Sequence, residues 1–357
     1  MLKDAIDLST LRRVLVIKLR HHGDVLLTSP VFSVLKNHAP HLEIDALVYQ
    51  DTAEMLSLHP AISQMHTVDR KWKSAGILAQ AKAEWKLLSA LRARNYDLII
   101  HLTEHNRGAW LSRLLSPRYA VTRKLAGKSL GWHGSFTHHY QAARAGGRHI
   151  VEENLDALRR LGIYPLPDER KLQLIPGKAA EDAITSRLQS AGLENKAFIH
   201  IHPTSRWLFK CWPHEKTAEL IERLQVEGHA IVITSAPDRT ELDMVERILN
   251  KLSRPPVNFA GQLALKELAV LASRARLFVG VDSAPMHIAA AMKIPVVVLF
   301  GPSGEALWGP WQVPSRVITT GHSCRPCGND GCGGGKLSEC LTDIPVKAVA
   351  AAINELL

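Results

Sequence analysis

The sequence predicts an α/β protein with two Rossmann-like domains, each built on a parallel sheet covered by helices. Three observations support this fold class. The chain has 357 residues, more than one ordinary domain contains. Short β-branched runs alternate with longer amphipathic stretches, as in parallel sheets joined by crossover helices. Several runs, such as VVVLF at 296–300, are apolar at every position, as expected for strands covered on both faces.

The expected elements fall into two series separated by a pause. Residues 162–196 include Pro165, Pro167, Pro176 and Gly177, and we interpret this segment as a linker. The predicted domains are therefore 1–175 and 176–357. We expect strands at 14–19, 44–49, 64–68, 97–102, 198–202, 230–234, 257–260, 277–281 and 296–300, and helices at 75–94, 152–161, 214–227 and 239–252.

The net charge of +10 is concentrated in the first half of the chain. Residues 1–176 hold 25 Lys+Arg and 16 Asp+Glu, whereas residues 177–357 hold 19 and 18. This distribution indicates an anionic partner for the N-terminal half, either nucleic acid, an anionic membrane surface or a phosphorylated substrate. A merely solvated basic surface is the alternative. Since neither a recognition-helix motif nor an aromatic stacking platform is present, we do not expect nucleic acid.

The sequence also limits where the protein acts. Asp4 and Asp7 interrupt the N-terminal segment and Lys18 breaks the apolar run that follows, so we expect no signal peptide. No apolar stretch reaches about 18 residues, the length of a membrane span. We therefore expect a cytoplasmic protein whose five cysteines are reduced.

Ligands of parallel α/β sheets bind beyond the carboxyl ends of the strands, so the residues after each strand matter most. The first expected strand is followed by RHHGD at 20–24 and by a helix that we expect to begin at Val25. The Gly-Asp pair allows a tight turn that points Asp24 over the sheet edge, although Asp24 could equally be a helix N-cap. The dinucleotide fingerprint G-x-G-x-x-G and the P-loop are both missing, which disfavours a nicotinamide, flavin or P-loop enzyme.

The strand at 198–202 is followed by a polar loop. Thr204, Ser205, Arg206 and Lys210 supply two hydroxyls and two cations within seven residues, which favours a phosphate cradle. Trp212-Pro213 would stiffen the entry into the next helix. The alternative is an ordinary polar loop with a surface lysine.

The strand at 277–281 is followed by Asp282, Ser283 and a helix that carries His287. The start of this helix offers unpaired amides and a positive dipole end, which suit a diphosphate. In the alternative interpretation Asp282 is a helix cap and His287 is a hydrogen-bonded, half-buried side chain. A third turn at 300–303 lies on the same predicted edge.

These segments together resemble a known family. GDVLLTSP at 23–30, K-x-W-P at 210–213, the DS-x3-H-x-AAA pattern at 282–291 and FGP at 300–302 are similar to the ADP-heptose:lipopolysaccharide heptosyltransferases, in the same order over nearly the whole chain. The resemblance implies a GT-B fold, in which two facing Rossmann-like domains enclose an interdomain cleft. It also implies inverting transfer of heptose from ADP-L-glycero-D-manno-heptose, bound by the C-terminal domain, to the second heptose of the lipopolysaccharide inner core, bound by the N-terminal domain.

The resemblance assigns roles to individual residues. Asp24 falls on the proposed base, and Lys210 falls on the lysine that binds the donor phosphate. Ser283-Ala284-Pro285 stands where many relatives have Thr-Gly-Leu, so the hydroxyl is kept while the proline removes one backbone donor. The full set of expected donor-binding residues is Thr204, Ser205, Arg206, Lys210, Asp238, Asp282, Ser283 and His287.

Because inner-core lipopolysaccharide is acidic and its lipid end lies in the membrane, the resemblance gives the basic half a role in binding the acceptor. We expect Arg20, His21, His22, Lys124 and Lys128 to contact the acceptor. Around the Asp24 turn we also expect Arg12, Arg13 and Lys18. Lys124 and Lys128 belong to a second expected patch, together with Arg118, Arg123, His138 and His139. Membrane attachment would then be peripheral, on the cytoplasmic face, and sensitive to salt.

Other expectations follow from what the sequence lacks. There is no D-x-D motif, and cations with a helix end can stabilise the leaving ADP, so we expect no cofactor and no obligatory Mg²⁺. We expect a monomer. A nucleotide-sugar epimerase of the same fold and a non-catalytic nucleotide- or glycan-binding module are the alternatives.

Four cysteines, Cys324, Cys327, Cys332 and Cys340, lie close together in a Gly-rich segment. Four thiols at this spacing could hold Zn²⁺, although structural zinc ligands more often come as two C-x2-C pairs. Disulfides and unliganded thiols are the alternatives.

Overall fold

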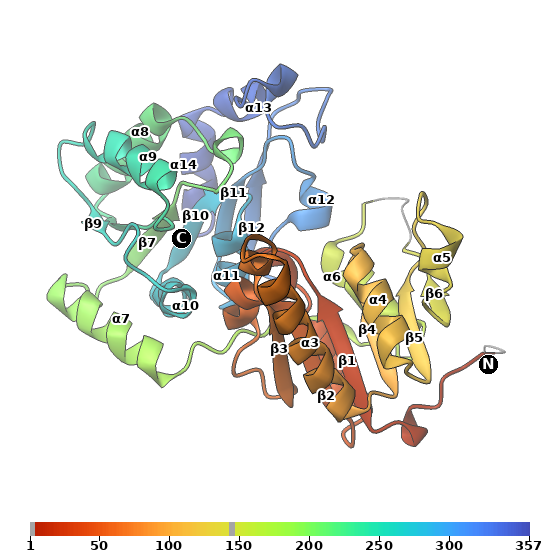
Figure 1. The fold of residues 1–357 in the computed structure, drawn as a ribbon. Helices are drawn as coiled ribbons and strands as arrows, with labels where there is room; N and C mark the ends of the chain where they lie inside the picture. Colours follow the sequence, from red (N-terminus) through yellow and green to blue (C-terminus); the bar gives the residue numbers. More distant parts are fainter. Residues whose placement is uncertain (1–3, 143–146) are drawn as a thin grey trace. The chain divides into compact units, whose positions relative to one another are not determined.

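A computed structural model describes residues 4–142 and 147–357. The chain divides into two compact units, Met1–Ile175 and Pro176–Leu357. Each unit contains a parallel six-stranded sheet with helices packed on both faces (Figure 1). The α/β fold class expected from the sequence is therefore confirmed.

The sheet of the first unit has the strand order β3-β2-β1-β4-β5-β6. Every neighbouring pair is parallel. The strands are β1 (Arg13–Lys18), β2 (Glu43–Tyr49), β3 (Gln64–Val68), β4 (Leu98–His101), β5 (Tyr119–Arg123) and β6 (His138–Tyr140). The α-helices are α1 (His22–Leu26), α2 (Ser29–His38), α3 (Ile77–Arg94), α4 (Asn106–Leu115), α5 (Leu130–His133) and α6 (Ile150–Arg159).

The sheet of the second unit has the order β12-β11-β10-β7-β8-β9, again with only parallel pairs. Its strands are β7 (Phe198–His202), β8 (Ala230–Ile233), β9 (Val257–Asn258), β10 (Leu277–Val281), β11 (Val296–Leu299) and β12 (Ser315–Ile318). Its α-helices are α7 (Lys178–Ser190), α8 (His214–Val226), α9 (Arg239–Leu249), α10 (Leu265–Arg274), α11 (Ala284–Ala291), α12 (Glu305–Trp308), α13 (Glu339–Thr342) and α14 (Val346–Asn354).

The two sheets share one topology. Counted from the first strand of each unit, both follow the order 3-2-1-4-5-6, in which the chain direction across the sheet reverses between the first and fourth strands. The reversal points are the β1/β4 pair and the β7/β10 pair. Crossover loops leave in opposite directions there, so each unit has a natural ligand site at that point.

All nine expected strands exist, and three further strands, β5, β6 and β12, were not expected. The expected linker at 162–196 is wrong in part, because it contains the 13-residue helix α7. The prolines and the glycine of that segment precede α7, and Gly177 is its N-cap at a φ of 87°. The turn signals therefore mark where this helix begins and not a continuous linker.

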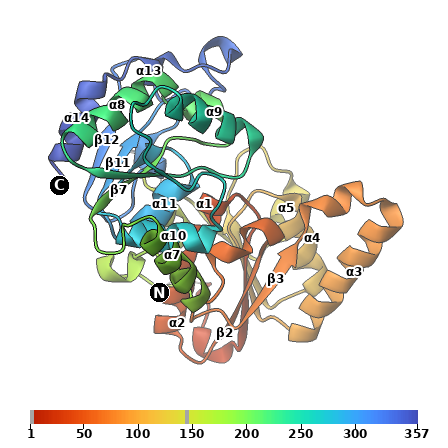
Figure 2. The same cartoon turned by 90° about the vertical axis from the view of Figure 1, so that its left-hand side faces the viewer.

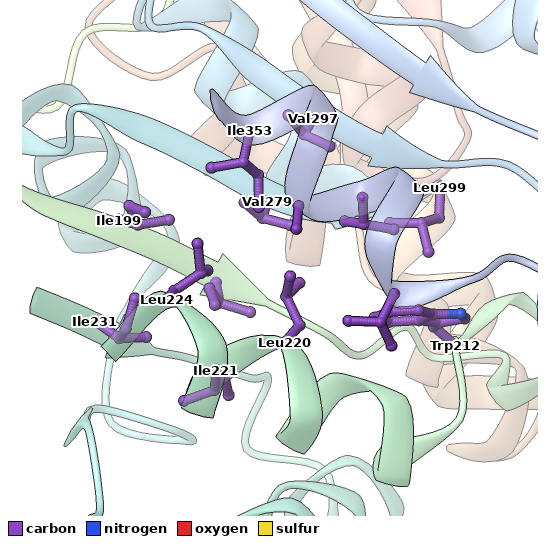
Figure 3. Packing of buried hydrophobic residues seen from close by; sticks show 14 of the residues in the cluster. Ile199, Trp212, Leu220, Ile221, Leu224, Ile231, Val279, Val297, Leu299 and Ile353 are labelled. Carbon is purple, nitrogen blue, oxygen red and sulfur yellow. The ribbon is translucent and has the colours of Figure 1, made fainter. Parts of the chain in front are cut away.

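Each face of the second sheet has its own hydrophobic core. Residues of α8 and α14 pack on one face and residues of α7, α10 and α11 on the other. Figure 3 shows the first of these cores, in which Leu220, Ile221 and Leu224 of α8 contact the sheet and Trp212 lies at its end. In the first unit, a core beneath α3, α4 and α5 includes Leu91 and Trp132. Figure 2 shows these three helices along one side of that unit.

A glycine allows α4 to lie close to the end of β4. A Cβ built on Gly108 would be 2.0 Å from the ring nitrogen Nε2 of His101, which is buried at the end of β4. The His101 ring stacks on Phe136 at 5.3 Å and accepts a hydrogen bond from, or donates one to, Thr103 at 2.8 Å. It therefore has little room to move away.

We expect Gly108→Ala to lower the free energy of unfolding by about 1–3 kcal/mol, because the added methyl overpacks a filled core. Gly131→Ala in α5 is the matched control, since its nearest neighbour would lie 3.6 Å from the new methyl. Urea denaturation of both variants measures the difference. An unchanged unfolding free energy for Gly108→Ala would contradict this packing.

Candidate active site

The reversal point of the second sheet brings together two residues predicted from the sequence. Lys210 lies at the end of a short 3-10 helix after β7, and Asp282 directly follows β10. Lys210 Nζ donates a hydrogen bond of 2.6 Å to Asp282 Oδ2. The side chains are only 19% and 8% exposed, so the ion pair is largely shielded from water. The indole ring of Trp207 lies 5.3 Å from the same ammonium group.

The position of Lys210 is set by the tryptophan two residues later. Trp212 is buried in the core of the second unit, where Figure 3 shows it beside Leu299. Its indole N–H donates to the carbonyl of Ile344 at 3.2 Å. Trp212 thus fixes the loop to the core, and Lys210 is held at the sheet edge by this anchor.

The first residues after β7 form a buried polar network. Thr204 is fully buried and its hydroxyl donates to Glu241 Oε2 at 2.6 Å. The same carboxylate oxygen accepts the amide of Ala236 at 3.3 Å. Glu241 therefore joins the loop after β7 to the loop after β8. The predicted hydroxyl of Thr204 is engaged inside the protein.

Two neutral histidines support this network from β7. His200 and His202 both contact Thr234 Oγ1, at 2.7 and 2.8 Å. Burial lowers the pKa of each imidazole to about 3. Both rings are therefore uncharged at neutral pH and act as hydrogen-bonding groups.

The helix α11 begins beside the Lys210–Asp282 ion pair. Ser283 is its N-cap in extended conformation, and its hydroxyl donates to the carbonyl of Val281 and accepts no hydrogen bond from an amide of the helix. The first amides of a helix have no partner within the helix, and the dipole favours an anion there. Pro285 in the first turn removes one such amide. His287, one turn into α11, is buried.

In the first unit, Asp24 lies at the corresponding edge. It follows β1 at the reversal point and is half-buried, with its Oδ1 3.9 Å from Arg20 Nε. The helix begins at His22 and not at Val25, and its N-cap is His21. Asp24 is therefore inside the first turn of α1, so the N-cap interpretation of this residue is wrong.

A buried cation lies behind this turn. Lys18 Nζ donates to the carbonyl of Leu102 at 3.2 Å and to Asn154 Oδ1 at 3.1 Å, and Asn154 in turn donates to the carbonyl of Leu27. Burial lowers the pKa of the Lys18 amine to about 8, and the nearby Asp24 carboxylate opposes this shift. Lys18 thus links β1, β4 and α6 beneath the Asp24 turn.

A family model gives the decisive comparison. Residues 84–337 match the model of glycosyltransferase family 9 (heptosyltransferase), which is more than half of the chain. The chain belongs to glycosyltransferase family 9.

Curated members of glycosyltransferase family 9 align over most of the chain. Lipopolysaccharide heptosyltransferase 3 of Escherichia coli (strain K12) is 39% identical over 82% of this chain and 83% of its own length. Lipopolysaccharide heptosyltransferase 1 of Pseudomonas aeruginosa is 27% identical over 88% and 86%. This chain is accordingly a glycosyltransferase, as expected.

Solved structures of the family confirm the fold. The family 9 glycosyl transferase from Veillonella parvula has a TM-score of 0.83 at 23% identity and covers 99% of this chain and 98% of its own. The structure of the E. coli heptosyltransferase WaaC with ADP has a TM-score of 0.74 at 21% identity, over 97% and 100%. The expectation of a GT-B fold is confirmed, with two Rossmann-like units in this family 9 chain.

The remaining predicted donor residues of this family 9 enzyme have other contacts. Asp238 is exposed and caps α9 by accepting the amide of Thr240 at 3.0 Å. The acidic residue that reaches the loop after β7 is Glu241, which our sequence interpretation missed although it lies one helical turn further on. Ser205 is buried beside Trp207, and Arg206 is exposed. Their roles in donor binding stay predictions.

Part of the basic cluster expected around Asp24 is elsewhere. Lys18 is buried. Arg12 and Arg13 lie at the start of β1, at the opposite edge of the sheet from Asp24, where Arg13 pairs with Glu43 at 2.8 Å. Arg12 and Arg13 are within twelve residues of Asp24 in the sequence. The six-residue strand β1 nevertheless lies between them and Asp24, and it places them at opposite edges of the sheet.

The expected second patch is also divided between two sheet edges. Arg118 and His138 lie at the starts of β5 and β6, whereas Arg123 is the last residue of β5 and Lys124 follows it. Arg123 pairs with Glu153 at 2.8 Å, and Lys128 Nζ lies 3.5 Å from Asn106 Oδ1. His139 is partly buried, which lowers the pKa of its imidazole. Of the expected second patch, Arg123, Lys124 and Lys128 therefore share a region at the carboxyl edge.

One cation beside the Asp24 turn, Arg70, is not among the residues predicted from the sequence. Arg70 donates to the carbonyl of Arg20 at 3.0 Å, and its Nε lies 3.3 Å from Asp51 Oδ2. Its guanidinium stacks over the ring of Tyr49 at 3.6 Å. His22 contacts the carbonyl of Asp51 at 2.9 Å. Arg70 lies two residues after the end of β3, so the rule for strand ends would have identified it.

The cysteine-rich segment does not assemble a metal site. Across residues 4–142 and 147–357, no three His, Cys, Asp or Glu side chains are grouped so that they could hold a metal ion. All five cysteines are free thiols, so the disulfide alternative is wrong. Cys324, Cys327 and Cys332 are exposed, whereas Cys340 is buried and its thiol pKa is raised by that burial.

A pocket of about 390 Å³ lies beside the K-x-W-P loop of the second unit. Its walls include Cys211, His214, Arg247 and Lys336, from the loop, α8, α9 and the cysteine-rich segment. The Lys210–Asp282 ion pair and Ser283 do not line it, so it is distinct from the predicted phosphate site.

Within the described part of the chain, no helix has both the length and the apolar character to cross a bilayer.

Because Lys18 is buried, the free energy of unfolding of the family 9 enzyme should depend measurably on pH. Between about pH 8 and pH 10.5, the unfolded chain keeps a proton on Lys18 that the folded unit has lost, so the free energy of unfolding contributed by this group rises with pH. Below about pH 8 both states are protonated and the full cost of the buried charge is present. A pKa that falls from 10.5 to about 8 corresponds to about 3 kcal/mol.

We therefore expect the unfolding free energy of the wild type, relative to Lys18→Met, to rise by about 3 kcal/mol from below pH 8 to above pH 10. Denaturation of both proteins at several pH values measures it. Lys171→Met, which removes an exposed cation of the same unit, is the control. A difference that is independent of pH would show that Lys18 keeps an ordinary pKa.

Proposed function

We propose that the chain transfers heptose from ADP-L-glycero-D-manno-heptose to the second heptose of the lipopolysaccharide inner core, with inversion at the anomeric carbon. The observation that carries the proposal is the shielded Lys210–Asp282 ion pair beside the start of α11, at the reversal point of the second sheet. Relatives that align over most of the chain are named lipopolysaccharide heptosyltransferases, and one related structure holds ADP. These relatives support the donor and acceptor class.

The donor diphosphate would bind at the start of α11. When the glycosidic bond breaks, negative charge grows on ADP, and Lys210 with the first amides of α11 would stabilise that charge. Asp282 repels phosphate, so we infer that it acts by holding Lys210 in place. Glu241 would order the same site from behind through Thr204.

The acceptor would bind at the carboxyl edge of the first sheet. Asp24 would accept the proton of the acceptor hydroxyl while that oxygen attacks the anomeric carbon from the side opposite ADP. Arg20, Arg70 and Lys124 lie at strand ends of the same edge and suit an acidic saccharide. The mechanism requires Asp24 and Lys210 to act on one bound donor.

The principal test is Asp24→Asn. We expect turnover to fall by about 10² to 10⁴, because a positioned base is lost, while the dissociation constant for ADP-heptose stays near the wild-type value. Transfer assays with a defined inner-core acceptor and calorimetric titration of donor measure the two quantities. Asp168→Asn, which changes an exposed carboxylate of the same unit, is the matched control.

Lys210→Met provides the contrasting result. It removes a charge-assisted contact to the diphosphate, so donor affinity should weaken by about 10- to 100-fold.

Wild-type turnover by Asp24→Asn would eliminate Asp24 as the base. Turnover of nucleotide sugar without any acceptor would support the epimerase alternative, and binding without turnover would support a non-catalytic module.

We also propose that the reaction needs no divalent metal ion, since Lys210 and the start of α11 supply positive potential to the diphosphate. Turnover should therefore persist in excess EDTA after dialysis against the chelator. Re-addition of Mg²⁺ and of Zn²⁺ to the dialysed enzyme is the control. Loss of turnover that either ion restores would contradict the proposal.

A further inference from the structure

The N-terminal unit has a strongly basic region that the proposed chemistry does not use. Residues 70–142 contain 13 Lys+Arg but only 3 Asp+Glu, a difference of +10 that equals the net charge of the whole chain. Two of the three acidic residues already have partners. Glu84 pairs with Arg107, and Asp97 accepts hydrogen bonds from the amides of Arg12 and Arg13. The region is therefore a concentrated positive surface.

Large apolar side chains are exposed in the same region. Ile77 and Leu78 at the start of α3 are 88% and 87% exposed, and Leu130 at the start of α5 is 91% exposed. Trp85 of α3 and Trp110 of α4 are 65% and 62% exposed. Single exposed apolar residues are common, but five on adjacent helices mark an interaction surface.

The exposed residues of α3 follow one helical face. Leu78, Lys82, Trp85 and Arg92 recur at intervals of four, three and seven residues, opposite the buried Leu87 and Leu91. Apolar and basic side chains therefore alternate along the outer side of the helix. An outer face of mixed basic and aromatic side chains suits a membrane interface, where aromatic rings can enter the headgroup region beside basic side chains.

The three helices form a connected surface. Arg107 of α4 pairs with Glu84 of α3, and Arg92 of α3 donates to the carbonyl of Leu114 in α4 at 3.4 Å. Arg113 of α4 donates to the carbonyl of Gly131 in α5. Figures 1 and 2 both show α3, α4 and α5 on one side of the unit. Among the residues described, no acidic side chain forms an ion pair with Lys82, Lys86, Arg92, Arg113, Lys124 or Lys128.

This surface adjoins the edge that carries Asp24. In a parallel sheet, each crossover helix begins near the carboxyl end of the strand before it. The most exposed apolar residues, Ile77, Leu78 and Leu130, are at the starts of α3 and α5 and so lie toward that edge. A bilayer contacted there would present its lipid-bound saccharides near Asp24.

We propose that α3, α4 and α5 form a docking surface for an anionic lipid bilayer. Basic side chains would bind acidic headgroups, and Leu78, Trp85, Trp110 and Leu130 would enter the interface. Each lysine or arginine near an anionic surface adds to the attraction, so the cations without an acidic partner suffice for reversible attachment. The acceptor that this surface serves rests on the proposed function, whereas the attachment itself requires neither donor nor acceptor.

Vesicle sedimentation of the full-length protein tests the attachment. We expect binding to vesicles of phosphatidylcholine mixed with phosphatidylglycerol, weak binding to phosphatidylcholine alone, and release by high salt. Lys82→Glu/Lys86→Glu and Leu78→Ser/Trp85→Ser should each lower partitioning by at least about tenfold. Val226→Ser/Lys251→Glu, which alters exposed residues of the other unit, is the matched control and should bind like the wild type.

Transfer assays separate this inference from the proposed function. The two surface variants should lose most transfer to an acceptor embedded in vesicles but keep wild-type transfer to a delipidated core oligosaccharide. Wild-type vesicle binding by both variants, or no binding by the wild type, would overturn the docking surface. If the variants also lose transfer to the soluble acceptor, this face binds saccharide and not a bilayer. If light scattering shows a dimer that the variants disrupt, the face binds a second copy of the chain. Vesicle binding without transfer to either acceptor would refute the proposed function alone.

Discussion

The ion pair between Lys210 and Asp282 is the interaction on which the proposed donor site depends. It joins the loops after β7 and β10, the two strands at the reversal point of the second sheet. A largely buried pair is costly to break, because the remaining charge would stay desolvated. Trp212 fixes one side of the pair through the core, and the rigid start of α11 follows the other side. The pair thus holds an ammonium group beside the start of a helix.

The same topology explains the first unit, where the buried cation has a different role. Lys18 ends β1 and bonds the chain after β4 and a side chain of α6, beneath Asp24. Burial lowers the pKa of this amine to about 8, and the nearby Asp24 carboxylate opposes the shift. Both units therefore place a lysine and a carboxylate near the reversal point. In the second unit Lys210 lies at the surface of the proposed site, whereas in the first unit Lys18 is buried beneath the Asp24 turn.

Much of this arrangement could be predicted from the sequence, because strand periodicity and the residues after each strand obey local rules. These rules predict that Lys210, Asp282, Ser283 and Asp24 follow strand ends, and the structure places them there. Residues whose role depends on contacts between loops were harder to find. Glu241 reaches Thr204 across 37 residues, and nothing in its own segment distinguishes it from Asp238, which caps the helix. Closeness in sequence also predicts that Arg13 lies near Asp24 and Arg118 near Lys124. Each pair is separated by a strand, however, and the two ends of a strand lie at opposite edges of the sheet.

The ion pair also constrains how a diphosphate can bind. With Asp282 on Lys210, the net charge of the pair is zero, so the ammonium group alone offers little attraction to a distant anion. A diphosphate that reaches the start of α11 meets unpaired amides first, and Lys210 has further N–H donors with which to reach it without leaving Asp282. Attraction would then grow mainly at short range, as charge develops on the departing ADP. We infer that such a site stabilises the transition state more than the resting donor, which is the property that raises turnover.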